Sequence, residues 1–302
     1  MFSEKKLNQI ARVRELAGLL GVDIFAHYYQ RPEVKLVANY VGGSRGLFRL
    51  IQKTLNPTIL LCGVNFMAET VARLRPELNV LIPRPDANCP YSETTRASVV
   101  WEIRRQDPTA LIVADAKAPG AVKDLADALI PLDFDSSYFQ DRAHNKRLYV
   151  LPGPNPLAQD PYAARLTEGV CQVHHQVELE AVLKAKAERP RALVAANVLC
   201  RDEVKARADK VGDSQALWDF CAQSEAKEFI VVAESGLSES LALTFSHKRF
   251  YDPGVEIFCP SMKLTNLRDL ITALESYQLK AGVLTRFGAR AVEGRLNRDL
   301  SG

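Results

Sequence analysis

Apolar and polar positions alternate along the chain in a pattern that recurs three times. The short apolar segments VDIFAHYYQ, ALIVADAKA and ALVAANVLC each lead through a polar break into a stretch with helical periodicity. They align without gaps, so that His27, Asp115 and Asn197 occupy the same position of the pattern. These positions are 88 and 82 residues apart. The spacing predicts an internal triplication.

Each repeat continues with a second apolar strand that ends in a glycine or proline turn. These strands lie in TILLCGVNFMAETV, RLYVLPGPNPLA and EFIVVAESGLSESL, and a third short strand follows in each repeat. Strands that alternate with amphipathic helices predict βαβ units and parallel sheets. We therefore predict an α/β fold of three αβα domains, each with a small, mainly parallel sheet, related by a pseudo-threefold axis.

The predicted domains comprise residues 1–104, with an N-terminal helix, residues 105–188 and residues 189–275. The basic segment 276–302 follows the last clear helical pattern, NLRDLITALESYQ. We expect this segment to join the first domain, either as a loosely ordered tail or as a cover.

Composition narrows the class of protein. The 302 residues are 47% hydrophobic and 25% charged, with a formal net charge of +3 and the basic residues scattered along the chain. This balance argues against a nucleic acid or an anionic membrane as partner, but it suits a small anionic substrate. No apolar run approaches the length of a bilayer span, and the charged N-terminal stretch is unlike a secretory signal. We expect a cytoplasmic protein, and the oligomeric state stays open.

The repeat selects three of the six cysteines, which form no CxxC pair and no tight cluster. Cys89, Cys171 and Cys259 each follow the last strand of a repeat, 62, 56 and 62 residues after the shared first-strand position. Ligands of parallel sheets bind beyond the carboxyl ends of the strands, so we expect the three thiols to converge at the central axis. Three thiolates suit an iron–sulfur cluster with one iron open to substrate. The other three cysteines are expected to be structural.

Motifs over residues 20–275 resemble those of the quinolinate synthase family, 4Fe-4S enzymes of NAD biosynthesis that condense iminoaspartate with dihydroxyacetone phosphate. They are AHYYQRPEV followed by GGS, then LCGVNFMAET, ANCPYSE, GVCQVHHQVE and CPSMKLTNL, in the family's order. The resemblance implies three domains of one design, each of which gives one cysteine to the cluster. These cysteines correspond to Cys89, Cys171 and Cys259.

The resemblance also implies contacts with substrate. His27 and Tyr29 match family residues that contact substrate, Ser44 matches one that helps hold it, and Ser214 stands where the family binds phosphate. A histidine and a tyrosine beside a Lewis-acidic iron can move protons, and a hydroxyl at a helix N-terminus can bind an anion. We expect His27 and Tyr29 to be catalytic and Ser44, Ser214 and His174 to bind substrate. For His174, a hydrogen-bonding role beside the cluster is the alternative.

The chain departs from the family pattern in the pocket. ADAKA stands where the family has YVN, so that Asp115 and Lys117 replace a tyrosine and an asparagine. NVLC stands where the family has HPEC, so that Asn197 and Leu199 replace a histidine and a glutamate. PLDFD at 131–135 stands where the family has TSSN. These exchanges predict a rebuilt pocket on a retained cluster scaffold, with Asn197 in contact with substrate.

Three further catalytic candidates lie at strand ends. Lys117 is in register with Tyr29, so we expect its ammonium group to face the cavity, with Asp115 on the same face. Lys117 would pair with an anionic substrate or, with a depressed pKa, attack a carbonyl. The alternative is a solvated salt bridge between the two residues. Glu234, in VVAESG, ends the second strand of the third repeat and is expected to face the cavity.

Three functions follow from this pattern. The first is a 4Fe-4S lyase, transferase or condensing enzyme, diverged from quinolinate synthase, whose open iron polarises a small carboxylate or phosphate-bearing substrate. The second is authentic quinolinate synthesis through altered contacts. The third is a non-catalytic, regulatory or sulfur-transfer iron–sulfur protein. Each implies the iron–sulfur assembly machinery as a partner, and the first two add a small anionic substrate.

Overall fold

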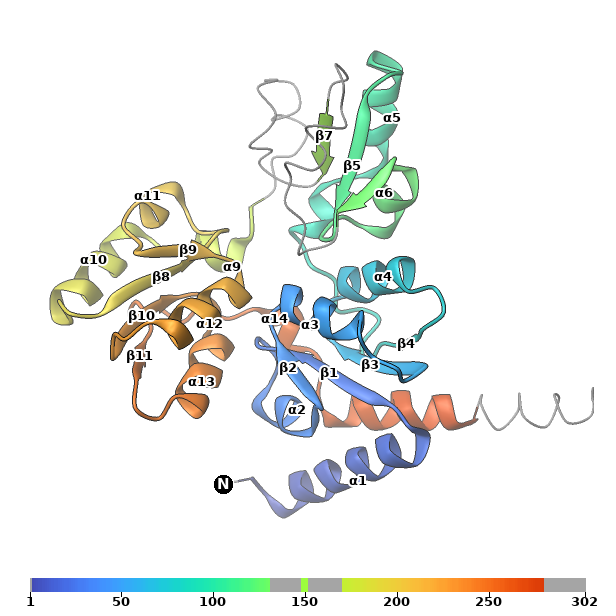
Figure 1. The fold of residues 1–302 in the computed structure, drawn as a ribbon, viewed down its shortest axis with the longest axis horizontal. Coiled ribbons are helices and arrows are strands. Elements are labelled where there is room, and N and C mark those ends of the chain that lie inside the picture. The colour runs from blue at the N-terminus through green and yellow to red at the C-terminus, as the bar shows by residue number, and fades with distance from the viewer. Residues whose placement is uncertain (1, 131–147, 152–169, 280–302) are drawn as a thin grey trace, which may run out of the picture.

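The computed structural model describes residues 2–130, 148–151 and 170–279, which form three small parallel sheets with helices around them (Figure 1). The predicted α/β class is confirmed. Within these ranges, no helix has the length and apolar character needed to cross a bilayer. The PLDFD stretch and the segment after residue 279 lie outside the described residues.

The first sheet, sheet A, has the strand order β2-β1-β3-β4, and all its strands are parallel. Its strands are β1 (Asp23–His27), β2 (Tyr40–Gly42), β3 (Thr58–Cys62) and β4 (Asn79–Leu81). Its helices are α1 (Glu4–Leu20), α2 (Pro32–Val37), α3 (Ser44–Ile51) and α4 (Asn65–Leu74). The central strand β3 is buried along its whole length, as expected for a parallel strand covered on both faces.

The second sheet, sheet B, has the order β6-β5-β7, again with parallel strands. Its strands are β5 (Leu111–Asp115), β6 (Ala128–Ile130) and β7 (Leu148–Leu151). Helix α5 (Ala97–Gln106) leads into it and α6 (Gly120–Leu125) follows its first strand. A short 3₁₀ helix, η1 (Ser92–Thr94), lies between sheets A and B along the chain.

The third sheet, sheet C, has the order β9-β8-β10-β11, which is the order of sheet A position by position. Its strands are β8 (Leu193–Asn197), β9 (Lys210–Gly212), β10 (Glu228–Val232) and β11 (Arg249–Tyr251). Its helices are α10 (Leu179–Glu188), α11 (Asp202–Lys205), α12 (Ser214–Gln223) and α13 (Ser235–Thr244). Two short helices, α9 (Gln172–His175) and α14 (Pro260–Lys263), precede and follow this group.

The predicted three strands per repeat are one too few for sheets A and C, which have four. The additional strands are β2 and β9, three-residue edge strands directly before α3 and α12. Sequence periodicity did not reveal them, because such short, mostly exposed strands contain too few alternating positions to give a period-two pattern.

A reciprocal pair of hydrogen bonds recurs in all three sheets. In the first bond, the backbone amide of a residue in the first strand donates to the side-chain oxygen of the residue 15 positions later. In the second, the backbone amide of that later residue donates to the carbonyl of the strand residue, at 2.8 Å in each sheet. The first bond joins Ile24 to Asn39 at 2.8 Å, Ile112 to Asp127 at 2.7 Å and Val194 to Asp209 at 2.7 Å. A short polar side chain, asparagine or aspartate, at the same position of each repeat therefore fixes how the chain enters the edge strand.

After sheet C the chain returns to sheet A. Residues 267–279 are helical, and Leu267, Leu270 and Leu274 join the apolar cluster formed by α1 and one face of sheet A. This helix lies beside α1 in Figure 1. The contact begins at Leu267, before position 276, where we expected the chain to rejoin the first domain.

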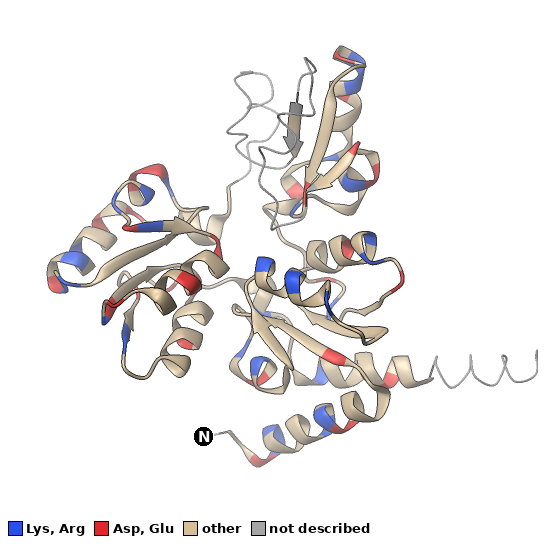
Figure 2. Cartoon of the chain, in the orientation of Figure 1, with Lys and Arg blue, Asp and Glu red and all other residues tan. Residues whose placement is uncertain are grey.

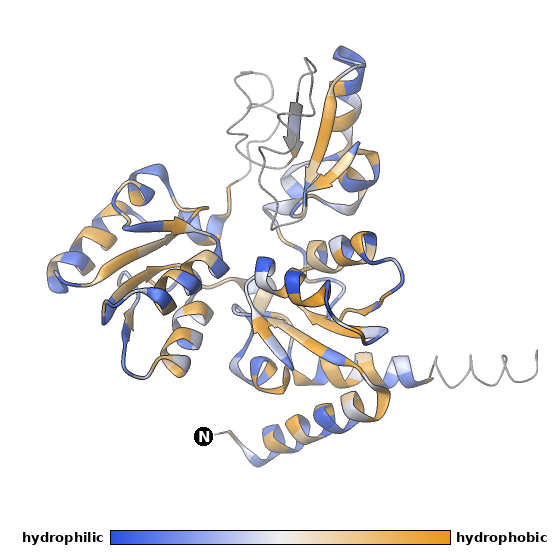
Figure 3. Ribbon diagram, viewed as in Figure 1, coloured by the Kyte–Doolittle hydropathy of each residue, from blue (hydrophilic) through white to orange (hydrophobic). Residues whose placement is uncertain are grey.

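Apolar residues concentrate on the central strands and on the helix faces that cover them (Figure 3). Lysine, arginine, aspartate and glutamate are spread over the helices and loops with both signs mixed (Figure 2). This distribution gives each sheet its own apolar core.

Sheets A and C also share a core through α3 and α12. Tyr28 stacks on Trp218 with ring centroids 4.6 Å apart and planes 10° apart. The backbones approach so closely at Gly43 that a Cβ there would lie 2.7 Å from the Gln215 backbone nitrogen. Only glycine fits such an approach without displacing its neighbour.

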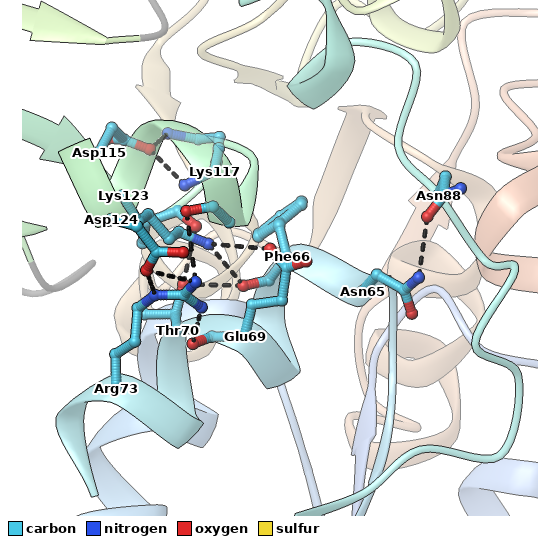
Figure 4. Close-up of polar contacts among 12 residues, drawn as sticks. Asn65, Phe66, Glu69, Thr70, Arg73, Asn88, Asp115, Lys117, Lys123 and Asp124 are labelled. Atoms are coloured by element: carbon cyan, nitrogen blue, oxygen red, sulfur yellow. Dashed lines mark hydrogen bonds and ion pairs between the residues drawn. The ribbon is translucent and has the colours of Figure 1, made fainter. Parts of the chain in front are cut away.

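Sheets A and B meet through α4 and α6, where polar contacts dominate (Figure 4). The Lys123 side chain has no exposed surface; its Nζ donates to the Phe66 carbonyl at 3.0 Å and lies 3.7 Å from the Glu69 carboxylate. The Thr70 hydroxyl donates to the Ala116 carbonyl at 2.8 Å. Burial, partly offset by Glu69, lowers the pKa of Lys123 to about 8.

The buried Lys123 predicts an unusual dependence of stability on pH. An unfolded lysine has a pKa of about 10.4, so between about pH 8 and pH 10.4 the unfolded chain binds more protons than the folded chain, and stability rises with pH. The melting temperature of the wild type, minus that of Lys123→Met, should increase by several degrees from pH 7.5 to pH 10. A constant difference would show that Lys123 has an ordinary pKa in the fold, and a decreasing one that its pKa is raised; either result would contradict the prediction.

Candidate active site

A cavity of about 130 Å³ lies where strand ends and helix N-termini of the three sheet regions meet. Ten of the predicted site residues line it: His27, Tyr29, Ser44, Cys89, Lys117, Cys171, His174, Asn197, Ser214 and Cys259. The rest of the wall is formed by Val64, Phe66, Tyr91, Val173, Val198, Leu199, Asp213 and Met262. All three selected cysteines therefore open on one cavity. The predicted site residues Asp115 and Glu234 are not part of its wall.

Each of the three cysteines begins a helical turn. Cys171 immediately precedes α9, and Cys259 immediately precedes α14, which has Pro260 at its start. The carbonyl of Cys89 accepts the amide of Glu93 at 3.1 Å, which closes the turn leading into η1. A proline fits the first helical position because its missing amide would have no partner there.

Burial raises the pKa of all three thiols, to about 12 for Cys259. A charge on Cys171 adds to the upward shift at both Cys89 and Cys259, so the sulfurs are close enough to interact electrostatically. Backbone amides that donate to each sulfur lower the pKa of its thiol and so oppose the effect of burial. They belong to Tyr91 and Ser92 at Cys89, to Val173 and His174 at Cys171, and to Met262 at Cys259. Amides that favour a charged sulfur are typical of thiolates bound to iron–sulfur clusters.

Among the described residues, no three histidine, cysteine, aspartate or glutamate side chains are close enough together to hold a single metal ion. The ligands of a cluster bind separate irons, and they lie farther apart than the ligands of one ion. Three thiols around one cavity therefore suit a cluster better than a mononuclear zinc site.

The first strand of each sheet ends in the same turn. A side-chain acceptor at the strand end receives the backbone amide of the residue two positions later. The bonds run from Tyr29 to His27 Nδ1 at 3.1 Å, from Lys117 to Asp115 Oδ1 at 2.8 Å and from Leu199 to Asn197 Oδ1 at 2.9 Å. Asp115 and Asn197 thus each supply the acceptor that the turn needs.

His27 is buried and neutral. Its Nδ1 accepts an amide hydrogen, so the ring proton lies on Nε2, which is 3.5 Å from the Ser214 hydroxyl. Burial, together with the positive charges of Lys263 and Lys35, lowers the pKa of His27 to about 3. The side chain is therefore a hydrogen-bond donor toward the cavity at neutral pH.

Tyr29 keeps its phenolic proton. Burial, together with the charges of Glu234, Cys171 and Cys259, raises the pKa of Tyr29 well above its ordinary value. Its hydroxyl oxygen accepts a hydrogen bond from Asn197 Nδ2 at 3.2 Å, which leaves the O–H free to donate. Asn197 thus fixes both its own strand-end turn and the tyrosine of another sheet.

His174 offers an unpaired nitrogen. Its Nδ1 lies 3.3 Å from the Cys171 sulfur, and its buried Nε2 has no hydrogen-bond partner within the described ranges. Burial lowers the pKa of His174 to about 4, so the ring is neutral. When Nδ1 donates to the sulfur, Nε2 becomes an acceptor in the cavity wall.

Lys117 is the cation of the cavity wall, and its Nζ lies 2.8 Å from Asp115 Oδ1 (Figure 4). Burial opposes its charge, but Asp115, with Tyr91 and Asp213, outweighs burial, so the pKa of Lys117 is raised. An amine nucleophile needs the opposite shift. The geometry therefore favours pairing with an anion over attack on a carbonyl.

The two predicted serines stand at helix N-termini. Ser44 opens α3, and Ser214 opens α12, with Asp213 as its N-cap. The Asp213 carboxylate accepts the Ala216 amide at 2.8 Å and pairs with Arg45 at 3.0 Å. Asp213 therefore occupies an amide that a bound phosphate would use and places a negative charge beside it.

Glu234 is buried beneath the cavity wall. Its carboxylate accepts the amides of Gly236 at 2.8 Å and Cys259 at 3.5 Å, and it pairs with Lys263 at 3.0 Å. Burial raises the pKa of Glu234, although Lys263 and the two amides oppose the shift. Its contacts fix the turn that carries Cys259 and do not reach substrate space.

Sequence reasoning missed Tyr91 and Asp213 as cavity residues. Tyr91 follows Cys89 by two positions, in the motif ANCPYSE, and is buried. Asp213 directly precedes Ser214 in VGDS. Both lie next to residues that the repeat had selected, so proximity to them was the available signal.

The chain resembles known proteins along almost its whole length. The family model described as quinolinate synthetase A protein matches residues 10–298. The quinolinate synthase of Methanosarcina barkeri is 32% identical over 97% of both chains, and that of Caldicellulosiruptor saccharolyticus is 33% identical over 87% of this chain and 88% of its own. The quinolinate synthase of Geobacter metallireducens is 31% identical over 87% of both. The chain therefore belongs to the quinolinate synthase family.

Proposed function

We propose that this protein is a 4Fe-4S enzyme with a diverged pocket. It would carry out dehydration, condensation or lyase chemistry on a small carboxylate or phosphate-bearing substrate. Cys89, Cys171 and Cys259 would hold the cluster, which would keep one iron open. One observation carries the proposal: three cysteines from three parts of the chain line the same cavity as the proton-bearing Tyr29 and the cation of Lys117.

We further propose that three domains, at about residues 1–104, 105–188 and 189–275, are related by a pseudo-threefold axis. The shared strand order of sheets A and C supports this arrangement. So do the reciprocal hydrogen bonds and the strand-end turns, which recur in all three sheets. Repeats with the same strand-end turn would each direct one side chain and one cysteine toward the axis.

When bound, the cluster would supply a Lewis-acidic iron that polarises a hydroxyl or carbonyl oxygen. The chain's own residues would bind substrate and move protons. Lys117 would pair with a carboxylate, and Tyr29 would donate its phenolic hydrogen to an oxygen that acquires negative charge. His174, a residue of the cavity wall, would accept a hydrogen bond from substrate at its unpaired Nε2.

The wall contacts favour a substrate different from that of the relatives. Leu199 adds an apolar surface where the resemblance implies a glutamate, so the cavity lacks that proton acceptor. Asp213 takes up an amide at the N-terminus of α12, and Gln215 Oε1 accepts the Gly43 amide at 3.2 Å before α3. With both helix ends partly occupied, a carboxylate paired to Lys117 suits the cavity better than a phosphate.

Authentic quinolinate synthesis is the second candidate, because the relatives carry that name over nearly the whole chain. Expression in a strain unable to make quinolinate separates the two. With the cluster loaded, we expect no rescue of growth. Rescue by the wild type, and its loss on changing Tyr29→Phe, would establish quinolinate synthesis and refute the diverged function.

Single changes of the three cavity cysteines to serine should each abolish the cluster. Serine retains the size of the residue but binds iron poorly in place of a thiolate. Iron and sulfide content after anaerobic purification should fall from full to near zero in Cys89→Ser, Cys171→Ser and Cys259→Ser. Cys62→Ser, at a buried position outside the cavity, should retain both. Retention of the full cluster in any of the three would contradict the ligand assignment.

Lys117→Met should weaken binding of a small dicarboxylate such as malate by about tenfold to a hundredfold, the usual effect of losing a hydrogen bond to a charged group. Because the pKa of Lys117 is raised, wild-type binding should stay constant from pH 7 to pH 9. Isothermal titration measures both. Lys205→Met is a matched control, since Lys205 also pairs with an aspartate, Asp202, at 2.7 Å, but away from the cavity wall. Equal losses in the two variants would rule out a specific anion contact.

A further inference from the structure

We propose that Arg31 and Arg201 are positioning residues that hold the turns of Cys259 and Cys171, each from another repeat of the chain. Within the part of the chain that the structure describes, no hydrogen bond from an arginine to the Cys89 turn is seen. The proposal rests on the cysteine assignment made above for its functional meaning. Its geometry stands on the hydrogen bonds of the described residues.

Arg31 reaches from sheet A to the turn that follows sheet C. Its Nε donates to the Lys263 carbonyl at 2.7 Å. Lys263 is the last residue of α14, whose N-cap is Cys259, and its amide donates back to the Cys259 carbonyl at 3.2 Å. The guanidinium therefore closes the far end of the one-turn helix that starts at the cysteine, a favourable place for a cation.

Arg201 makes the same contact from sheet C. Its Nε donates to the His175 carbonyl at 2.7 Å, and His175 is the last residue of α9, whose N-cap is Cys171. In both cases the carbonyl belongs to the fourth residue after the cysteine. The two hydrogen bonds have equal length and join equivalent positions, so the same contact recurs at two of the three cysteine turns.

The two arginines also occupy equivalent positions and conformations. Each is the fourth residue after the strand-end acceptor, His27 or Asn197, and each is the N-cap of the next helix. Their backbone angles agree within a few degrees, with φ −57° and ψ 147° at Arg31 and φ −57° and ψ 151° at Arg201. The equivalent residue in the second repeat is Pro119, with φ −62° and ψ 154°.

Proline has no side-chain donor, so Pro119 cannot make the contact that Arg31 and Arg201 make with a cysteine turn. The Cys89 turn is closed within its own repeat: the Thr94 hydroxyl donates to the Tyr91 carbonyl at 2.7 Å, and the Asn65 side chain donates to Asn88 at 2.8 Å (Figure 4). Two thiols are thus fixed by contacts between repeats and the third by local contacts. The Glu234–Lys263 pair adds a second hold on Cys259 only.

The test compares Arg31→Gln and Arg201→Gln with Arg14→Gln as the matched control. Arg14 also donates a guanidinium hydrogen to a backbone carbonyl, that of Leu36 at 3.0 Å, but away from the cysteines. The first readout is the rate of iodoacetamide alkylation at each cysteine of the full-length chain stripped of iron, followed by mass spectrometry. The second is the rate at which the loaded protein loses its visible absorbance to a chelator.

Arg31→Gln should speed alkylation at Cys259 by about fivefold, and Arg201→Gln at Cys171 by a similar factor, because each loses one charged hydrogen bond. In each of these two variants, the alkylation rates of the other two cavity cysteines should equal those of the wild type within error, and Arg14→Gln should change no alkylation rate. Arg31→Gln and Arg201→Gln should also lose the cluster to the chelator faster than the wild type. Unchanged rates, or equal increases at all cysteines with a lower melting temperature, would overturn the proposal. A wild type that takes up no cluster would refute the proposed function, while the alkylation pattern would still decide the arginine contacts.

Discussion

The turn at the end of each first strand is the constraint on which the rest of the structure depends. A side-chain acceptor at His27, Asp115 or Asn197 receives the amide two residues later and so sends the chain away from the sheet at a fixed angle. The residue that donates this amide then lines the cavity in all three repeats; it is Tyr29, Lys117 or Leu199. One local hydrogen bond therefore selects which side chains line the site. Because the residue two positions later takes part through its backbone amide, its side chain can differ between repeats while the turn stays the same.

Burial determines what those side chains can do. Both cavity histidines are neutral, because burial lowers the pKa of His27 to about 3 and that of His174 to about 4, and Tyr29 stays protonated. Burial opposes the charge of Lys117, but Asp115, with Tyr91 and Asp213, outweighs burial and keeps the amine charged. The cavity wall thus combines neutral donors and acceptors with the Lys117 cation and with the Asp213 carboxylate, which is paired with Arg45.

Much of the fold and the position of the three cavity cysteines could be predicted from the sequence, because both a strand pattern and a cysteine recur in it at similar spacing. The edge strands β2 and β9 could not, since three mostly exposed residues carry no periodicity. The surroundings of Glu234 also escaped prediction, because its partner Lys263 comes from another segment and draws the carboxylate beneath the wall. Pairings between repeats, such as Asn197 with Tyr29, depend on how the sheets pack, and periodicity within one repeat does not encode that packing.

The central claim is that three thiols from three repeats hold a cluster with an iron open to substrate. The most direct measurement is paramagnetic resonance of the anaerobically purified, reduced protein during titration with malate, together with its iron and sulfide content. The account predicts about four irons and about four sulfides per chain and a spectrum that shifts as the acid binds. A protein that contains zinc or no metal after reconstitution, or a cluster whose spectrum ignores every small carboxylate and phosphate ester, would contradict it.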